Sequence, residues 1–136
     1  MTTITMRQIN NDKYNANHGQ RAEYIFRYTW TGLLCKADNL PASLCADCDG
    51  IQIKSARATI CKGTDIRAHV EADPAEWYAY VVNDFTIAYI MSKAEYIEFA
   101  TRFATVTTES PDNGGAIKTR LKIEGRKMTA WLKSHA

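Results

Sequence analysis

The chain has 136 residues, of which 46% are hydrophobic and 24% charged, and its formal net charge is +2. This balance predicts one globular domain, residues 1–136, that buries its own core without disulfides. The apolar runs are short, and no charged region followed by an apolar one opens the chain, so we expect an intracellular protein without a membrane segment. Residues 101–136 hold seven basic and three acidic residues, which suits a polyanionic partner or a solvated helix.

The first eighteen residues are polar and show no sustained period, which predicts a loosely ordered N-terminal arm over residues 1–18. From Gly19 onward, apolar residues recur every three or four positions, which predicts a helix that ends at Gly32. Glu23 lies beside the apolar stripe. Its ordinary account is an ion pair with Arg27 one turn later, worth about 0.3–0.5 kcal/mol.

Two strand signals follow the helix. Residues 33–37 predict a short strand that stops before Pro41, because proline cannot continue a ladder of hydrogen bonds. The second strand begins near Asp49, and in it isoleucines alternate with Gln52 and Lys54. The amide and the ammonium are therefore expected to project from one face, as on any exposed sheet face.

The second half of the chain predicts further strands and helices. The alternating aromatic residues around Tyr78 and Tyr80 are expected in the core rather than on a base-stacking surface. In order, we expect a short helix over 65–70, a hairpin with strands over 77–82 and 85–91, a helix opened by a capping box at Ser92 and continuing to Phe103, a loop over 105–118, and an amphipathic helix over 123–133.

The order and spacing of the polar residues resemble the PD-(D/E)xK nuclease superfamily. The matching segments are Gly19-Gln20-Arg21-Ala22-Glu23 for its helix element, Lys36-Ala37-Asp38 for its PD element, and Ile51-Gln52-Ile53-Lys54 for its acid-x-Lys element. Ala37 replaces the usual proline, and Gln52 replaces the second acid. The resemblance implies an α/β fold with a restriction-endonuclease-like core, in which a helix is followed by a small mixed β-sheet, a second helix packed on it and a C-terminal helix.

The same resemblance implies a metal-dependent DNA endonuclease with Glu23, Asp38, Gln52 and Lys54 as catalytic residues. Mg²⁺ or Mn²⁺ prefers hard oxygen ligands, and the implied set is Asp38, the amide oxygen of Gln52, Glu23 and the backbone carbonyl of Ile53. Lys54 would lower the pKa of the attacking water or neutralise the transition state. Phosphodiester hydrolysis needs both functions.

DNA is therefore the expected partner. Because one small domain offers one active site, cutting both strands favours a homodimer. Arg57 follows the acid-x-Lys element and is a further candidate for phosphate contact. The candidates in the basic C-terminal part are Lys118, Arg120, Lys122, Arg126 and Lys127.

The four cysteines are candidate ligands for a structural metal ion. Cys45 and Cys48 form one CxxC motif, which together with Cys35 and Cys61 has the ligand types of a structural zinc site. Reduced free thiols in an intracellular protein are the simpler account. Two alternatives to a nuclease remain: a catalytically inactive DNA-binding or protein-interaction module on the same scaffold, and a zinc-stabilised binding protein.

Overall fold

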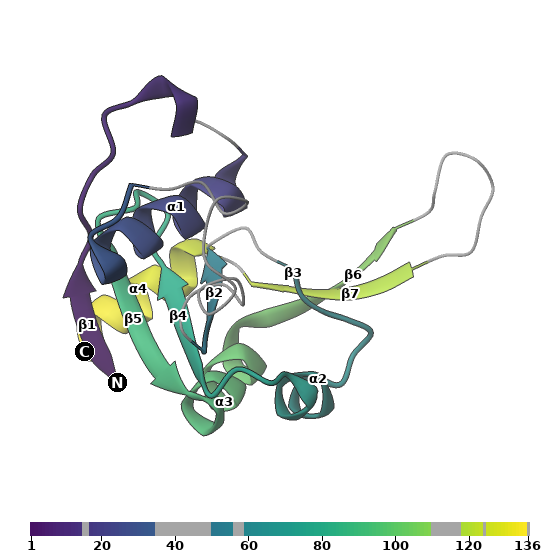
Figure 1. Ribbon diagram of the computed structural model, residues 1–136. Helices are drawn as coiled ribbons and strands as arrows, with labels where there is room; N and C mark the ends of the chain where they lie inside the picture. The colour runs from purple at the N-terminus through teal and green to yellow at the C-terminus, as the bar shows by residue number, and fades with distance from the viewer. Residues whose placement is uncertain (15–16, 35–49, 56–58, 110–117, 124, 136) are drawn as a thin grey trace.

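The computed structural model describes residues 1–14, 17–34, 50–55, 59–109, 118–123 and 125–135. It shows a mixed α/β protein with a four-stranded and a three-stranded sheet (Figure 1). Within these residues no helix is long and apolar enough to cross a lipid bilayer. The elements are β1 (Thr2–Thr5), the 3-10 helix η1 (Asp12–Tyr14), α1 (His18–Thr31), β2 (Ile51–Ser55), β3 (Thr59–Lys62), α2 (Ile66–Ala72), β4 (Trp77–Val81), β5 (Ile87–Ser92), α3 (Lys93–Phe103), β6 (Ala104–Glu109), β7 (Lys118–Ile123) and α4 (Gly125–His135).

The main sheet has the strand order β1-β5-β4-β2. Strand β2 is parallel to β4, whereas β4 pairs antiparallel with β5 and β5 with β1. The β4–β5 hairpin confirms the predicted one, and its turn places Phe85 at a φ of 61°. The sheet is therefore mixed, and β2 is at one end of the order of its described strands.

Helix α1 covers one face of the main sheet. Its residues Ala22, Ile25 and Phe26 share a buried cluster with Ile51 and Ile53 of β2. The helix starts where the side chain of Asn17 accepts a hydrogen bond from the backbone N–H of Gln20 at 2.9 Å, and it ends at Gly32 with a φ of 74°. The helix predicted between Gly19 and Gly32 is thus confirmed.

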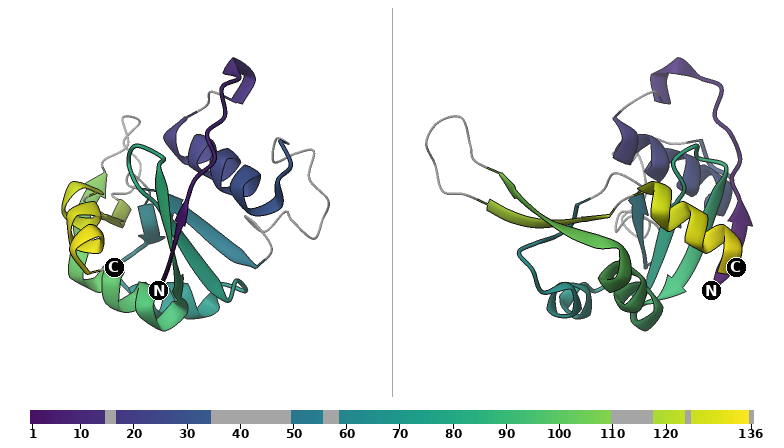
Figure 2. Two further views of the ribbon diagram at one scale, coloured as in Figure 1. Left: turned by 90° about the vertical axis from the view of Figure 1, so that its left-hand side faces the viewer. Right: turned by 180° about the vertical axis from the view of Figure 1, so that it is seen from behind.

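The other face packs against α3 and α4, as the view from behind in Figure 2 shows for α4. The capping box at Ser92 and Glu95 is formed in both directions, which confirms the predicted start of α3. Asp65 caps α2, and Leu132 of α4 is buried, so both predicted helices are also confirmed. The core of this layer is aromatic: the rings of Tyr78 and Tyr96 stack at 4.3 Å.

Two predictions were wrong. Residues 1–18 are not a loosely ordered arm, because β1 adds to the main sheet beside β5 and Met6 and Ile9 are buried. The residues 105–118 are not a continuous loop, because 104–109 form β6, antiparallel to β7. Both segments are rich in threonine, whose β-branched side chain favours strands but adds no hydrophobic period.

The second sheet has the order β3-β7-β6 and projects away from the main body (Figures 1 and 2). Leu121 of β7 is buried in the core that α3 and α4 share, which anchors the base of this sheet. We call the three strands together the ribbon. The predicted strand over 33–37 falls mostly on residues 35–37, outside the described part of the chain.

Candidate active site

Strand β2 presents two polar side chains on one face of the main sheet. Ile51, Ile53 and Ser55 are buried, whereas Gln52 and Lys54 are half-buried. Successive side chains of a strand point to opposite faces, so the amide and the ammonium project together. The isoleucines pack under α1, and the polar pair therefore lies on the opposite face.

The pairing of β2 with β4 sets the neighbours of this pair. Gln52 is in register with Tyr78 and Lys54 with Tyr80. Both tyrosines are buried in the cluster that includes α3 and α4 residues. Within the described residues, neither the Gln52 amide nor the Lys54 ammonium makes a hydrogen bond or an ion pair. Both polar groups are thus available to a ligand.

The hydroxyl of Tyr80 lies in a strongly apolar environment. Its side chain is 0% exposed, and burial raises the pKa of Tyr80 to about 12, although the Thr129 side chain of α4 acts in the opposite direction. A phenol with this pKa keeps its proton at neutral pH. Tyr80 therefore adds no negative charge beside Lys54.

The hydroxyl of Tyr78 donates to the Asp73 carboxylate at 2.9 Å. The other carboxylate oxygen of Asp73 accepts from the backbone N–H of Ala75 at 2.8 Å, and Lys93 donates to the Asp73 carbonyl. Asp73 is therefore engaged in structural hydrogen bonds before β4. Sequence reasoning missed this polar cluster, although Asp73 followed by a proline is a recognisable turn signal.

Glu23 belongs to α1 and so to the layer on the other face of the sheet. Its carboxylate lies 3.7 Å from the guanidinium of Arg27. This is the ion pair that the spacing of the two residues in the sequence predicts. The Arg27 side chain is only 3% exposed and that of Glu23 is 29% exposed. Helix α1, which carries Glu23, therefore covers the face of β2 opposite to Gln52 and Lys54.

Several predicted site residues lie outside the described part of the chain. These are Asp38, Arg57 and three of the four cysteines, Cys35, Cys45 and Cys48. Cys61 lies on β3, but its side chain is also outside what the structure describes. Within the described residues, no group of three or more histidine, cysteine, aspartate or glutamate side chains is arranged to hold a metal.

The predicted DNA-contacting residues divide between two elements. Lys118, Arg120 and Lys122 occupy alternate positions of β7, whereas Arg126 and Lys127 lie in the first turn of α4. Lys127 is exposed. The structure thus separates one basic stretch of sequence into a strand and a helix.

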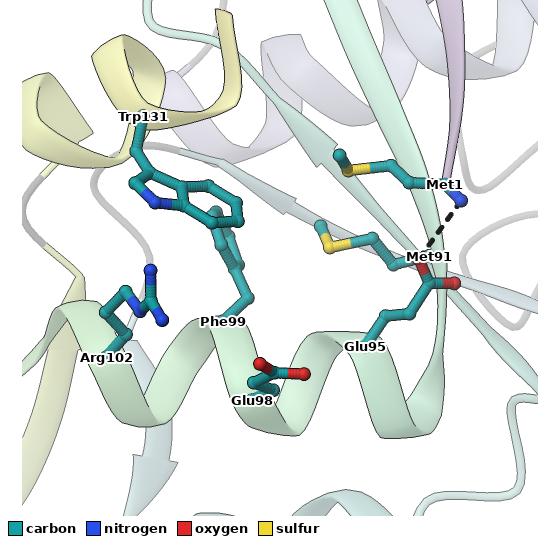
Figure 3. Close-up of a pocket in the computed structure, with 7 residues that line it drawn as sticks. All are labelled: Met1, Met91, Glu95, Glu98, Phe99, Arg102 and Trp131. Carbon is teal, nitrogen blue, oxygen red and sulfur yellow. Dashed lines mark ion pairs between the residues drawn. The ribbon is translucent and has the colours of Figure 1, made fainter. Parts of the chain in front are cut away.

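A cavity of about 110 Å³ lies between α3, α4 and the start of β1 (Figure 3). Met91, Phe99 and Trp131 line it, and the N-terminal ammonium of Met1 pairs with Glu95 at 3.0 Å beside it. Because the order is β1-β5-β4-β2, this cavity lies toward the β1 edge, away from the candidate residues on β2. It is not the site predicted from the sequence.

Searches of protein-family models, curated proteins and solved structures found no match to this chain.

Proposed function

We propose that the chain is a metal-dependent endodeoxyribonuclease with a restriction-endonuclease-like core, which hydrolyses DNA phosphodiester bonds as an intracellular homodimer. The observation that carries the proposal is the Gln52 and Lys54 pair on β2. Both side chains share one face, both are half-buried, and neither has a partner within the described residues. Partly burying an ammonium without a partner costs free energy, which argues for a ligand that compensates it.

The chemical types of the donors fit Mg²⁺ or Mn²⁺. The amide oxygen of Gln52, the carbonyl of Ile53 and the carboxylate of Asp38 are hard oxygen donors that would hold the ion. When bound, the metal supplies Lewis-acid polarisation of a phosphate oxygen and a more acidic water. Lys54 acts on the same phosphate, because its positive charge stabilises the negative charge that grows during hydrolysis.

Glu23 has a supporting role at the metal in this proposal. Its carboxylate, 3.7 Å from the Arg27 guanidinium, would hold the metal directly or through water. An ionised Glu23 carboxylate would accept a hydrogen bond from metal-bound water. Each chain offers one such site, and a twofold homodimer supplies the second for the opposite strand.

Cleavage of plasmid DNA tests the proposal. Supercoiled, linear and four-way-junction DNA should be cut with Mg²⁺ or Mn²⁺ and left intact with EDTA. Lys54→Ala and Asp38→Ala should abolish cutting while circular dichroism shows an unchanged fold. Arg67→Ala is a matched control, because the Arg67 ion pair with Glu71 is exposed and lies on α2. Equal cutting by the wild type and both site variants would refute the nuclease proposal.

A second candidate function is a catalytically inactive DNA-binding module on the same scaffold. Gln52 in place of an acid, together with the engagement of Glu23 by Arg27, favours it. Such a module would bind DNA equally well with and without a divalent metal and would cut none of the substrates. Metal-dependent cleavage therefore separates the two candidates.

A further inference from the structure

The ribbon is built differently from the rest of the protein. It projects from the body in Figure 1, and its base is anchored through Leu121, which is 5% exposed. Directly opposite on β6, Val106, the register partner of Leu121, is 60% exposed. Among the ribbon side chains that the structure describes, Leu121 thus packs into the core while Val106 stays exposed, which leaves this part of the ribbon accessible to a binding partner.

The strand pairing of the ribbon places its basic residues at positions on one face. Leu121 of β7 pairs with Cys61 and Val106, and these positions share one face. The basic residues of β7 alternate with Leu121, so their positions fall on the opposite face. That face also receives Lys62 of β3, which is in register with Arg120. The basic positions are Lys62, Lys118, Arg120 and Lys122, and the single acid among the described ribbon residues, Glu109, is opposite Lys118 on the same face, so basic positions outnumber acidic ones by four to one.

The dimensions of the ribbon suit double-stranded DNA. Strand β3 pairs with β7 only between Arg120 and Lys122, so the outer part, where Glu109 pairs with Lys118, is two-stranded. The major groove of B-DNA, about 12 Å wide, admits a two-stranded β-ribbon. Strands β6 and β7 extend roughly 20 Å over their six residues, and the register pairs Thr108–Thr119 and Glu109–Lys118 form the described two-stranded end.

We infer that the ribbon, rather than α4, is the element that holds duplex DNA. Its outer, two-stranded part enters the major groove, and the face with the four basic positions contacts backbone phosphates. The inference rests on the proposed function for its choice of DNA as the partner. It assigns binding to the ribbon and chemistry to the Gln52 and Lys54 pair, which makes the two separable.

Anisotropy of a labelled DNA duplex, titrated with the full chain in EDTA at several salt concentrations, tests the inference. The triple variant Lys118→Gln, Arg120→Gln, Lys122→Gln should lower the log-log salt slope by about 2–3 units and the low-salt affinity by at least about tenfold. A control with the same charge change, Lys13→Gln, Arg67→Gln, Lys133→Gln, should shift the slope by less than about one unit. Equal slopes for the two triple variants would overturn the inference.

Two further measurements accompany the titration of the triple variants. The single variant Lys118→Gln removes a charge at the outer end and should lower the slope by about one unit even if the triple variant folds poorly. Methyl green, which occupies the major groove, should compete with the wild type, whereas netropsin, which occupies the minor groove, should not. Competition by netropsin alone would overturn the groove assignment.

Failure of this inference and failure of the nuclease proposal have different signatures. If Lys54→Ala stops cutting while the ribbon variant binds normally, the ribbon inference is wrong and the nuclease proposal stands. If no variant or wild type cuts DNA but the ribbon variant loses binding, the ribbon inference stands and the nuclease proposal is wrong.

Discussion

Tyr78 donates its hydroxyl proton to the carboxylate of Asp73, with 2.9 Å between the two oxygens. This hydrogen bond connects the first half of β4 to the turn that follows α2, beneath the stacked ring of Tyr96. It fixes the strand that is in register with Gln52. The candidate site therefore has a rigid aromatic neighbour on its inner side.

The first prediction concerns this hydrogen bond. Tyr78→Phe should lower the free energy of unfolding by about 1–2 kcal/mol, because a partly buried hydrogen bond to a carboxylate is lost. Urea unfolding followed by circular dichroism measures it. Tyr28→Phe is the control: the Tyr28 hydroxyl accepts from Arg7 at 3.1 Å in an exposed position, and its loss should cost less than about 0.5 kcal/mol. Equal costs would contradict the prediction.

The second prediction concerns alkaline pH. Burial raises the pKa of Tyr80 from 10.0 to about 12, so the folded protein holds this proton more tightly than the unfolded chain. Stability contributed by the neutral phenol is complete below pH 10 and is lost as pH rises toward 12, by up to about 2–3 kcal/mol. Urea unfolding across this range measures it. Tyr80→Phe should flatten the decline, and an equally steep decline in that variant would disprove the assignment.

Helix α1 offers a matched pair of glycines for the third prediction. Gly32, at a φ of 74°, ends the helix, and Gly32→Ala should destabilise the protein by about 1 kcal/mol. Gly19 lies in the first turn, where a Cβ would meet only the Asn17 side chain at 3.7 Å. Gly19→Ala should therefore stabilise by about 0.5–1 kcal/mol. Thermal unfolding measures both changes, and the same sign for both would contradict the cap assignment.

The fourth prediction concerns Gln52, which occupies the position of the second acid in the acid-x-Lys element. An amide oxygen carries no net charge, so Gln52→Glu should tighten Mg²⁺ binding by about tenfold or more. Calorimetric titration of Mg²⁺ measures the affinity directly, with Gln52→Ala as the control that should weaken it. If Gln52→Glu and Asp38→Ala both leave the affinity unchanged, residues 38–54 hold no metal and the inactive module becomes the better proposal.

The elements with a strong local signal could be predicted from the sequence. The start of α3 was predictable because Ser92 and Glu95 satisfy each other's neighbouring backbone groups, and the end of α1 because Gly32 adopts a left-handed conformation. The pairing of β1 with β5 was not, because Thr2–Thr5 is too short to show a period and its partner is distant in sequence. Strand β6 was missed for a related reason, since threonines alternate with only one large apolar residue, Val106.

For the candidate site, the sequence predicts which side chains share a strand face but not what surrounds them. The alternation of Gln52 and Lys54 follows from the period of two along β2. Their placement beside Tyr78 and Tyr80 depends on the parallel register of β2 with β4, a contact made by tertiary packing. The position of Glu23 behind the sheet likewise depends on which face α1 covers.

The pairing of β1 with β5 imposes an order on folding. Thr2 is synthesised well before its partner Ile90. Until β5 has been synthesised, β1 has no ladder to join and stays an unpaired strand of the nascent chain. Such a strand is a site for intermolecular pairing between neighbouring nascent chains, so slower translation before residue 92 prolongs the exposure. Strand β1 can therefore join the main sheet only after the β4–β5 hairpin has emerged, although it precedes the other described strands of that sheet in sequence.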